Sequence, residues 1–361
     1  MATVLELPTH RRTERQRPSP AAKAARIVWC LSGLNLALVV AVLLLIFVVS
    51  ESWWVAAAIS YLPRSPWMLP AIALGIAACW FHRPSAWVNV IAIGLVAGPI
   101  MELRLPGVLN APGQALAAPG RETLRVVSCN IQSYKPNFAE VMQEVSAAHP
   151  DVVVFQEAFG EHRLLQDFFP DWHKLHVSTY WVGSRYPVRL LAECPSQVFD
   201  RVSGIMVEVD APGGTVVLAN VHQMTARRGL QAIHKGSVLR GEAGEDVDSF
   251  RELRAFEATE IRRTIEQHRG DRPLIVAGDF NSPTSSSVFH ETWGDLQSAF
   301  DIAGWGYGYT SPCKSHRYWP PNLPWARIDH ILCSPHWTVA SCQVGRGNGS
   351  DHRLIAAELR R

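Results

Sequence analysis

The chain has 361 residues, of which 48% are hydrophobic, and its formal net charge is +2. This length exceeds that of one small domain, so two or more parts are expected. Residues 121–361 carry 25 Lys and Arg against 28 Asp and Glu, a net charge of −3. That balance argues against a protein that binds long DNA tightly and without sequence preference, because such proteins carry a basic surface.

Three apolar stretches near the N-terminus are predicted to be membrane helices. Residues 27–49 contain no charge and are long enough to cross a hydrocarbon core of about 30 Å. A cleaved signal peptide has a shorter apolar region of about 7–15 residues, so an uncleaved span is favoured. Residues 67–81 and 86–101 are shorter and are separated by a short link. They predict a helical hairpin in the membrane, with a buried hairpin of a soluble domain as the alternative.

The distribution of charge predicts the orientation of these spans. Residues 1–26 form a basic tail, and an excess of Lys and Arg stays on the cytoplasmic side. The loop predicted at 50–66 contains only Glu51 and Arg64 as charged residues. One or three spans would leave the chain outside after residue 105, whereas two would return it. We therefore expect a multi-pass protein of the cell membrane whose C-terminal part is extracytoplasmic.

The rest of the chain predicts a linker followed by one large domain. Residues 106–122 are rich in Pro, Gly and Ala, as linkers are. Within 123–361, apolar β-branched runs alternate with helical patterns near 137–149 and 249–269, which predicts buried sheets covered by helices. In the second helical pattern, the apolar face is expected to consist of Phe250, Leu253, Phe256, Ile261 and Ile265.

Loops and cysteines give weaker signals. Residues 226–248 are expected to form a mobile loop, and 304–325 an aromatic loop of the length that is often functional. Four of the seven cysteines could pair in an oxidising compartment, although their spacing does not say which. They are Cys194, Cys313, Cys333 and Cys342.

Six strand-like runs end or begin in polar residues. These residues are Asn130, Glu157, Asn220 with His222, Asp279 with Asn281, Asp329, and Asp351 with His352. Because alternate side chains of a strand share a face, Asp279 and Asn281 are expected to point one way and Phe280 into the core. By the same rule, His330 faces away from Asp329. Asp and Asn also cap helices and start turns, but six such runs favour one shared site.

This set of residue types suits metal-assisted hydrolysis of a phosphoester. A carboxylate such as Glu157 is a hard oxygen ligand of the kind that Mg²⁺ prefers. The metal polarises a phosphoryl oxygen and stabilises the charge that develops on it. A His oriented by an Asp can act as a general base, an effect worth roughly 10²–10⁴ in rate. Amide and imidazole donors can hold the phosphoryl oxygens as charge builds.

The same runs carry a resemblance to a known family. In chain order they read SCNIQ (128–132), FQE (155–157), NVHQ (220–223), GDFN (278–281), RIDHIL (327–332) and SDH (350–352). Together they resemble the endonuclease/exonuclease/phosphatase superfamily, whose members are similar to deoxyribonuclease I. The resemblance extends over 121–361 and implies an α/β (α+β) fold, a four-layer sandwich of two packed, mainly antiparallel sheets flanked by helices. Here it would follow an all-α transmembrane region.

The resemblance also implies roles for the polar residues. Glu157, Asn130 and Asp351 would bind Mg²⁺, with Mn²⁺ as a possible substitute. The catalytic residues would be His352 paired with Asp329, together with Asp279, His222 and Asn281. Asp279 would orient or activate the attacking water or assist the leaving group, while Asn281 and His222 would bind the scissile phosphate. Whether Asp279 or His352 takes the proton of the water stays open at this point.

The expected function is a membrane-anchored, metal-dependent phosphoesterase acting on a phosphodiester or phosphomonoester. Its substrate would be a lipid headgroup, a nucleic acid or a small phosphoester, and its N-terminal helices would contact the lipid bilayer. An extracytoplasmic nuclease acting on DNA or RNA is the specific alternative. An inactive binding module on the same fold is an alternative of another class, and the completeness of the polar set argues against it. Residues 324–330 depart from the Trp-Cys-Asp-Arg type segment of inositol polyphosphate 5-phosphatases, which disfavours that specificity.

Overall fold

The chain divides into two compact units in the computed structural model. The structure describes residues 19–106, 122–135, 137–231, 243–313, 319–347 and 349–361. One unit contains residues 1–39 and 67–94, and the other contains 40–66 and 95–361. Most of the expected basic tail and linker lies outside the described residues, as does part of the expected loop at 226–248.

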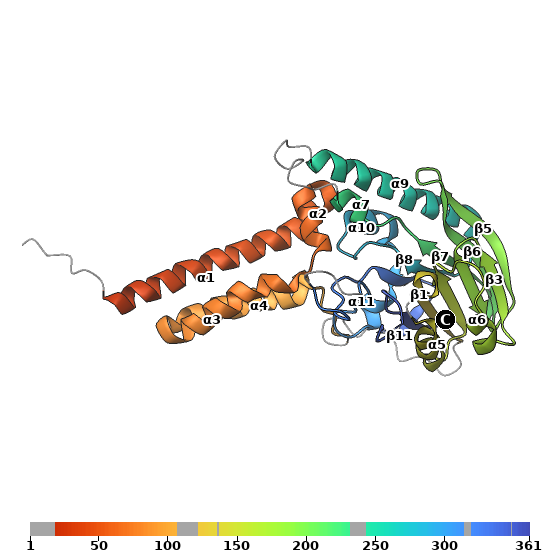
Figure 1. Cartoon of the computed structure of the whole chain (residues 1–361), viewed down its shortest axis with the longest axis horizontal. Coiled ribbons are helices and arrows are strands. Elements are labelled where there is room, and N and C mark those ends of the chain that lie inside the picture. Colours follow the sequence, from red (N-terminus) through yellow and green to blue (C-terminus); the bar gives the residue numbers. More distant parts are fainter. Residues whose placement is uncertain (1–18, 107–121, 136, 232–242, 314–318, 348) are drawn as a thin grey trace, which may run out of the picture. The chain divides into compact units, whose positions relative to one another are not determined.

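The first unit is helical (Figure 1). Its elements are α1 (Pro20–Leu44), which continues beyond the unit, α3 (Leu69–Phe81) and α4 (Arg83–Leu95). Gly75 and Asn89 lie equally far along the chain on either side of His82. A Cβ added to Gly75 would lie 3.5 Å from the Cβ of Asn89, so α3 and α4 form the expected antiparallel hairpin. The Asn89 side chain also donates a hydrogen bond of 2.8 Å to the Ser32 hydroxyl of α1.

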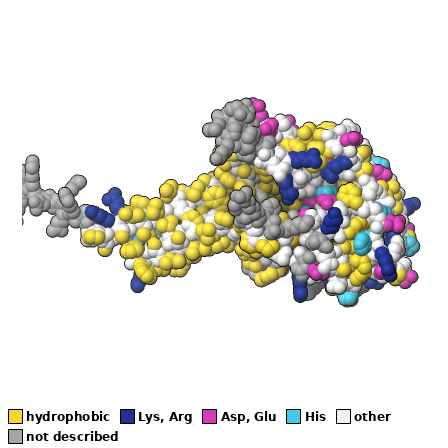
Figure 2. Space-filling view, viewed as in Figure 1, with side chains coloured by type: hydrophobic (Ala, Val, Ile, Leu, Met, Phe, Trp, Pro, Cys, Tyr) yellow, Lys and Arg dark blue, Asp and Glu magenta, His cyan; other side chains and the backbone are white. Residues whose placement is uncertain are grey.

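Within the part of the chain that the structure describes, two helical runs are long and apolar enough to cross a membrane, Pro20–Ser52 and Arg83–Ile100. A third apolar helical run, Ser65–Phe81, is shorter. Hydrophobic side chains gather over α1, α3 and α4 in Figure 2. Because a core helix or a signal sequence can have the same length and composition, membrane crossing by all three helices stays a prediction.

The second unit is built around two six-stranded mixed sheets. The first sheet contains β1 (Thr123–Asn130), β2 (Val152–Gln156), β3 (His173–Val177), β4 (Tyr180–Ser184), β11 (Thr338–Val344) and β12 (Ile355–Arg360). The second contains β5 (Val188–Ser196), β6 (Arg201–Ala211), β7 (Gly214–His222), β8 (Leu274–Asp279), β9 (Gln297–Ser298) and β10 (Asp329–Cys333). Their strand orders are β11-β12-β1-β2-β4-β3 and β5-β6-β7-β8-β10-β9. The pairs β1–β2 and β7–β8 are parallel, and the other pairs are antiparallel.

The alternation of side chains along these strands sorts residues into three buried clusters. In β1, Val126 faces the other sheet, whereas Val127 packs under α5 (Phe138–Ala147) and α6 (Arg163–Phe168). In β8, Ile275 faces the other sheet, whereas Val276 packs under helices α9 and α10. Helix α9 spans Ala243–Arg269 and α10 spans Ser287–Trp293. The result is helices, sheet, sheet and helices, which confirms the expected four-layer sandwich (Figure 1).

Several shorter elements connect these layers. They are π-helical turns at Leu45–Val49 and Val96–Ile100, 3₁₀ turns at Ser50–Ser52, Ser65–Met68 and Gln132–Tyr134, and helices α2 (Trp54–Tyr61), α7 (Arg227–Gln231) and α11 (Ala299–Ala303). The segment expected to be a loop at 50–66 is therefore mostly helical. Its two charged residues, Glu51 and Arg64, are buried.

One local expectation was wrong. In α9, Leu253 and Phe256 are 40% and 50% exposed, so they do not belong to the buried face. That face includes Arg254 and Glu257, which are buried because each has an ion-pair partner. The seven cysteines are free thiols, so no disulfide links the four cysteines that could have paired.

Candidate active site

Polar side chains gather where the two parallel strand pairs end. Asn130 of β1 lies beside Gln156 of β2, and His222 of β7 lies beside Asp279 of β8. Along each strand, these residues have the same parity as the residues that face the opposite sheet. The alternation therefore places all four side chains between the sheets, at one end of the central core.

Gly278 allows β7 and β8 to approach closely beside this site. Its φ angle is +152°, and a Cβ added there would lie 1.9 Å from the Val221 carbonyl oxygen. Any larger residue would push the two strands apart. Gly278 thus permits the close approach that places Asp279 next to His222.

Asp329 and His352 form a buried pair. The Nδ1 atom of His352 donates to Asp329, with distances of 2.8 Å to Oδ2 and 3.1 Å to Oδ1. The other ring nitrogen lies 3.7 Å from Asp279 Oδ2. Burial disfavours the imidazolium, but Asp329 and then Asp279 outweigh it and raise the pKa of His352 to about 10. At neutral pH this histidine therefore carries a proton on each nitrogen.

The side-chain amide of Asn130, in the first sheet, donates hydrogen bonds to two carboxylates, and one of them, Asp279, belongs to the second sheet. Its Nδ2 atom donates to Glu157 Oε1 at 3.0 Å and to Asp279 Oδ2 at 3.1 Å. The Nε2 atom of His222 lies 3.9 Å and 3.6 Å from the same two oxygens. Burial lowers the pKa of His222 to about 4, so the ring is neutral at pH 7. Burial also raises the pKa of Asp279, an effect that His352 opposes.

These partners leave net negative charge, because the single imidazolium of His352 faces the carboxylates of both Asp279 and Asp329. Among the described residues, no Lys or Arg forms an ion pair with Glu157 or Asp279. Glu157 and Asp279 share the neutral Asn130 amide and the neutral His222 ring. A divalent cation that prefers oxygen ligands would stabilise the charged forms of these two carboxylates. The residues present therefore fit Mg²⁺ or Mn²⁺ on the Glu157 side of the site.

A second group of possible ligands is less suited to a metal. Side-chain atoms of Asp279, Asp329 and His352 lie within 4.8 Å of one another, which is close enough for one ion. However, Nδ1 of His352 is a donor to Asp329, and a protonated nitrogen cannot be a metal ligand. The geometry of this group favours proton transfer instead.

A cavity of about 260 Å³ opens beside these residues. Its walls include Asn281, Asp351 and His352 from the expected set, and also Tyr61 and Trp325. The structure therefore brings Asp351 to the cavity near His352. The aromatic loop expected at 304–325 contributes Trp325, which lines the cavity.

Asn281 reaches the cavity by a different route from the one expected. Strand β8 ends at Asp279, and Asn281 has a left-handed backbone with a φ angle of +49°. Its N–H donates to Asp279 Oδ1 at 2.9 Å, and its side-chain amide donates to the Gln223 carbonyl at 2.8 Å. A turn therefore places Asn281, not strand alternation. Phe280 does pack into the core, against Phe289 and Trp293, as expected.

Several residues near the site pack or form hydrogen bonds beneath it and do not line the cavity. His330 faces away from Asp329 and packs against Phe289, as expected. The Nε2 atom of Gln156 donates to Asn220 Oδ1 at 2.7 Å, and the Asn220 amide donates to the Phe155 carbonyl at 3.0 Å. These buried amides join the two sheets directly below the site. Sequence analysis did not assign this role to them.

The sequence analysis also missed residues from the apolar N-terminal region. These are Glu51 and Tyr61, with their partner Arg254 in α9, and Arg64, with its partner Glu102. Glu51 and Arg64 are the only charged residues in a segment of otherwise uncharged sequence. Isolated charges in such a segment were the one available signal that they have buried partners.

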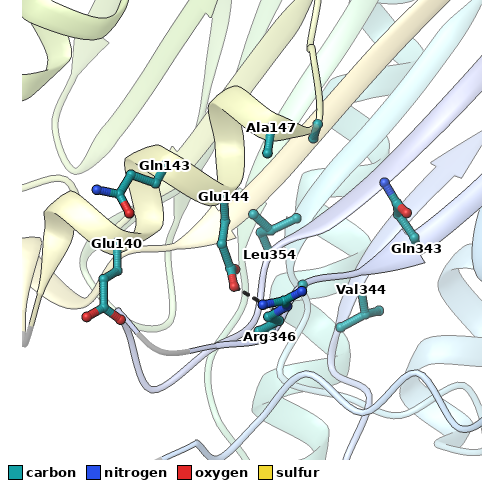
Figure 3. A pocket seen from close by; sticks show the side chains of 10 residues that line it. Glu140, Gln143, Glu144, Ala147, Gln343, Val344, Arg346 and Leu354 are labelled. Atoms are coloured by element: carbon teal, nitrogen blue, oxygen red, sulfur yellow. Dashed lines mark hydrogen bonds between the residues drawn. The ribbon is translucent and has the colours of Figure 1, made fainter.

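A larger hollow of about 670 Å³ lies elsewhere, between α5 and the end of β11 (Figure 3). Glu144 on its wall accepts a hydrogen bond of 3.0 Å from the Arg346 backbone N–H. None of the strand-end residues described above lines it. The smaller cavity beside His352 is therefore the candidate active site.

The order and geometry of these residues agree with a comparison of the sequence with known families. The Endonuclease/Exonuclease/phosphatase family matches residues 127–352, which is more than half of the chain. The chain belongs to this family. The match includes every strand-end residue from Asn130 to His352. At the level of the family, the prediction of a hydrolase acting on phosphoester bonds is confirmed.

Solved structures with a similar fold have low sequence identity to the chain. An endonuclease/exonuclease/phosphatase family protein from Bacteroides thetaiotaomicron is 14% identical, with 66% of this chain and 98% of that chain covered and a TM-score of 0.48. A mannosyl-6-phosphatase from the same species is 16% identical, with coverage of 65% and 99% and a TM-score of 0.47. A 3′ phosphatase from Neisseria bound to a product DNA hairpin is 17% identical, with coverage of 65% and 98% and a TM-score of 0.47. No curated protein matched the sequence.

Proposed function

We propose that the protein is a membrane-anchored, metal-dependent phosphoesterase that hydrolyses a phosphodiester or phosphomonoester with water. One observation carries the proposal. The carboxylates of Glu157 and Asp279 share the amide of Asn130, and Asp279 faces the buried pair of His352 and Asp329. A candidate cation-binding group and a candidate proton-transfer group therefore lie next to each other, and His352 of the second group lines the cavity, as metal-assisted hydrolysis requires.

The residues divide the work of the reaction. Glu157, Asn130 and Asp351 are the proposed ligands of Mg²⁺, or of Mn²⁺ in its place. Bound metal would supply positive charge that polarises a phosphoryl oxygen.

Asp279 is the proposed acceptor of the proton from the attacking water. Its raised pKa makes its carboxylate a stronger base than an ordinary aspartate. His352 already carries both of its protons at neutral pH, so it is suited to donating a hydrogen bond to the charge that builds on the phosphoryl group. Asn281 and the neutral ring of His222 supply further donors to the phosphate oxygens.

The test is a screen of the full chain, purified in detergent, against DNA, RNA, phospholipids, inositol phosphates and small phosphoesters. With Mg²⁺ we expect release of phosphate or of a phosphomonoester from at least one class, and EDTA should abolish it. Turnover of nucleic acids alone would identify the nuclease alternative. No turnover of any class would favour an inactive binding module on the same fold.

We further propose that the catalytic domain is extracytoplasmic. The basic tail and three crossings support this orientation, whereas crossing by only the two longer helical runs would place the domain in the cytoplasm. A reporter enzyme that folds only outside the cytoplasm, fused after Arg361, should be active. Activity confined to a cytoplasmic reporter would contradict the proposed orientation.

A further inference from the structure

The turn that carries Asn281 continues into a segment held by residues that flank the apolar helices. We call residues 281–288 the phosphate segment. All of the contacts described next lie within the second unit. The Ser50 hydroxyl donates to the Ser285 carbonyl at 3.2 Å and accepts from the Ser287 N–H at 3.0 Å. The end of the first apolar run is thus bonded directly to the phosphate segment.

Glu51 continues this contact with both carboxylate oxygens. Oε2 accepts from the Ser286 hydroxyl and, at 3.3 Å, from the Val288 N–H. Oε1 accepts from the Tyr61 hydroxyl at 2.6 Å and from Arg254 at 2.8 Å. The side chains of Glu51 and Arg254 are only 2% and 4% exposed, so this is a fully buried ion pair.

Arg254 connects the pair to the catalytic turn. Its guanidinium donates to the Asn281 carbonyl at 3.3 Å and to the Ser282 hydroxyl. The Asn281 N–H in turn donates to Asp279. A continuous series of hydrogen bonds therefore runs from Glu51 through Arg254 and Asn281 to Asp279.

A second buried pair from the same region holds the middle of the phosphate segment. Arg64 donates to Glu102 at 2.8 Å and to the Ser285 hydroxyl at 2.8 Å. Glu102 accepts from the Thr284 hydroxyl at 2.9 Å. Burial opposes ionisation of Glu102, but Arg64 and Arg327 lower its pKa to about 2. Both sides of this contact are thus charged at neutral pH.

Tyr61, at the end of α2, brings this region to the cavity itself. Its ring lines the cavity together with Asn281 and His352. Its backbone carbonyl accepts from the Trp325 indole at 3.0 Å, which fixes a second wall of the cavity. The cavity is therefore incomplete without the segment that precedes the catalytic domain expected from sequence.

Stability alone does not account for such an arrangement. A buried ion pair contributes little more to stability than a well-packed apolar pair of the same volume, because both charges lose their hydration. Charge-assisted hydrogen bonds are short and directional, so their distinctive effect is on position. We propose that Glu51 and Arg254 are positioning residues that set the place of Asn281, so that residues 50–64 form part of the active site. The inference rests on the proposed phosphoesterase function.

The test uses the full chain in detergent and the double variant Glu51→Leu with Arg254→Met. Replacing both charges with apolar groups leaves no unpaired buried charge, so the variant should fold. The matched control is Glu208→Gln, a buried carboxylate that pairs with Arg189 and Arg272 and, among the described residues, forms no ion pair with the phosphate segment. The substrate is bis(p-nitrophenyl) phosphate with saturating Mg²⁺.

We expect the KM of the double variant to rise about tenfold or more, because a hydrogen bond to a charged phosphate is lost or misplaced. The control should keep the wild-type KM within about twofold. A KM value does not depend on how much of the enzyme is folded, so a merely structural loss would not move it. A wild-type KM in the folded double variant would overturn the inference.

A second measurement separates this inference from the proposed function. If the wild-type chain hydrolyses none of the substrates, the phosphoesterase proposal fails, and amide hydrogen exchange still tests the positioning. Peptides covering 281–288 should exchange faster in the double variant than in the wild type and in Glu208→Gln. Equal exchange in all three proteins would overturn the inference on its own.

Discussion

The site has two halves that the same strand arrangement presents in different environments. The parallel pair β1–β2 leads to Asn130 and Glu157, and the parallel pair β7–β8 leads to His222 and Asp279. The Glu157 side chain is 31% exposed, whereas that of Asp279 is 2% exposed. An exposed carboxylate can exchange a hydrated cation, and a buried one has the shifted pKa that proton transfer requires. The proposed function therefore assigns metal binding to the half with Glu157, the metal half, and proton transfer to the half with Asp279, the proton half.

The largest expected effect comes from breaking the proton half. Asp279→Ala and His352→Ala should each lower kcat by roughly 10²–10⁴, because general acid–base catalysis is lost. Circular dichroism should show that both variants fold. His336→Ala, which removes an exposed histidine outside the site, should keep the wild-type rate. Wild-type kcat in both Asp279→Ala and His352→Ala would refute the assignment of this half.

Breaking the metal half should change the metal requirement more than the chemistry. Glu157→Gln keeps the shape of the side chain and removes its charge. We expect the Mg²⁺ concentration for half-maximal activity to rise by about 10–100-fold, the size of effect known for changes around metal ligands. Glu161→Gln, which alters an exposed glutamate nearby in the sequence, is the matched control. If the Mg²⁺ concentration for half-maximal activity were unchanged in Glu157→Gln, the assignment of the metal to this half would be wrong.

The smallest expected effect concerns the pH dependence of stability. The folded-state pKa of His352, about 10, lies above the usual value of about 6.5. Its charged form therefore stabilises the folded chain fully below about pH 6.5, and this contribution is lost as the pH rises through about 10. Asp329→Asn removes the carboxylate that raises this pKa most, so it should lower the pKa by about one unit or more.

Denaturant unfolding with EDTA at several pH values between 6.5 and 10 measures this change. The free energy of unfolding of Asp329→Asn should fall less steeply with rising pH than that of the wild type. Parallel curves for the two proteins would show that the carboxylate of Asp329 does not control the charge of His352.

Local patterns in the sequence were sufficient for much of the fold and the site. Runs of β-branched residues predicted the central strands. The polar residues at the strand ends predicted one shared site, and the roles of its residues stay a prediction. Strand alternation correctly separated Asp279 from Phe280 and Asp329 from His330. These successes depend on short-range geometry, which a sequence states directly.

Features that depend on distant partners were not predicted. Leu253 and Phe256 have helical spacing but face outward, because Arg254 and Glu257 take the buried positions with ion-pair partners. The role of Glu51 depends on a residue about two hundred positions away in the chain. Strand alternation did not predict the position of the Asn281 side chain, because the strand ends at Asp279 and a turn follows it. A pattern of single residues does not state which charges will find partners.

The amide pair of Gln156 and Asn220 has a mechanical consequence for the two halves. Most of the contact between the sheets is made by apolar side chains, whose contacts have no preferred direction and tolerate small sliding movements. The hydrogen bonds from Gln156 to Asn220, and from Asn220 to the Phe155 carbonyl, do have a direction. Because these hydrogen bonds are directional, they resist sliding of one sheet over the other directly beneath the site. One pair of buried amides therefore helps to fix the position of one sheet relative to the other beneath the candidate site.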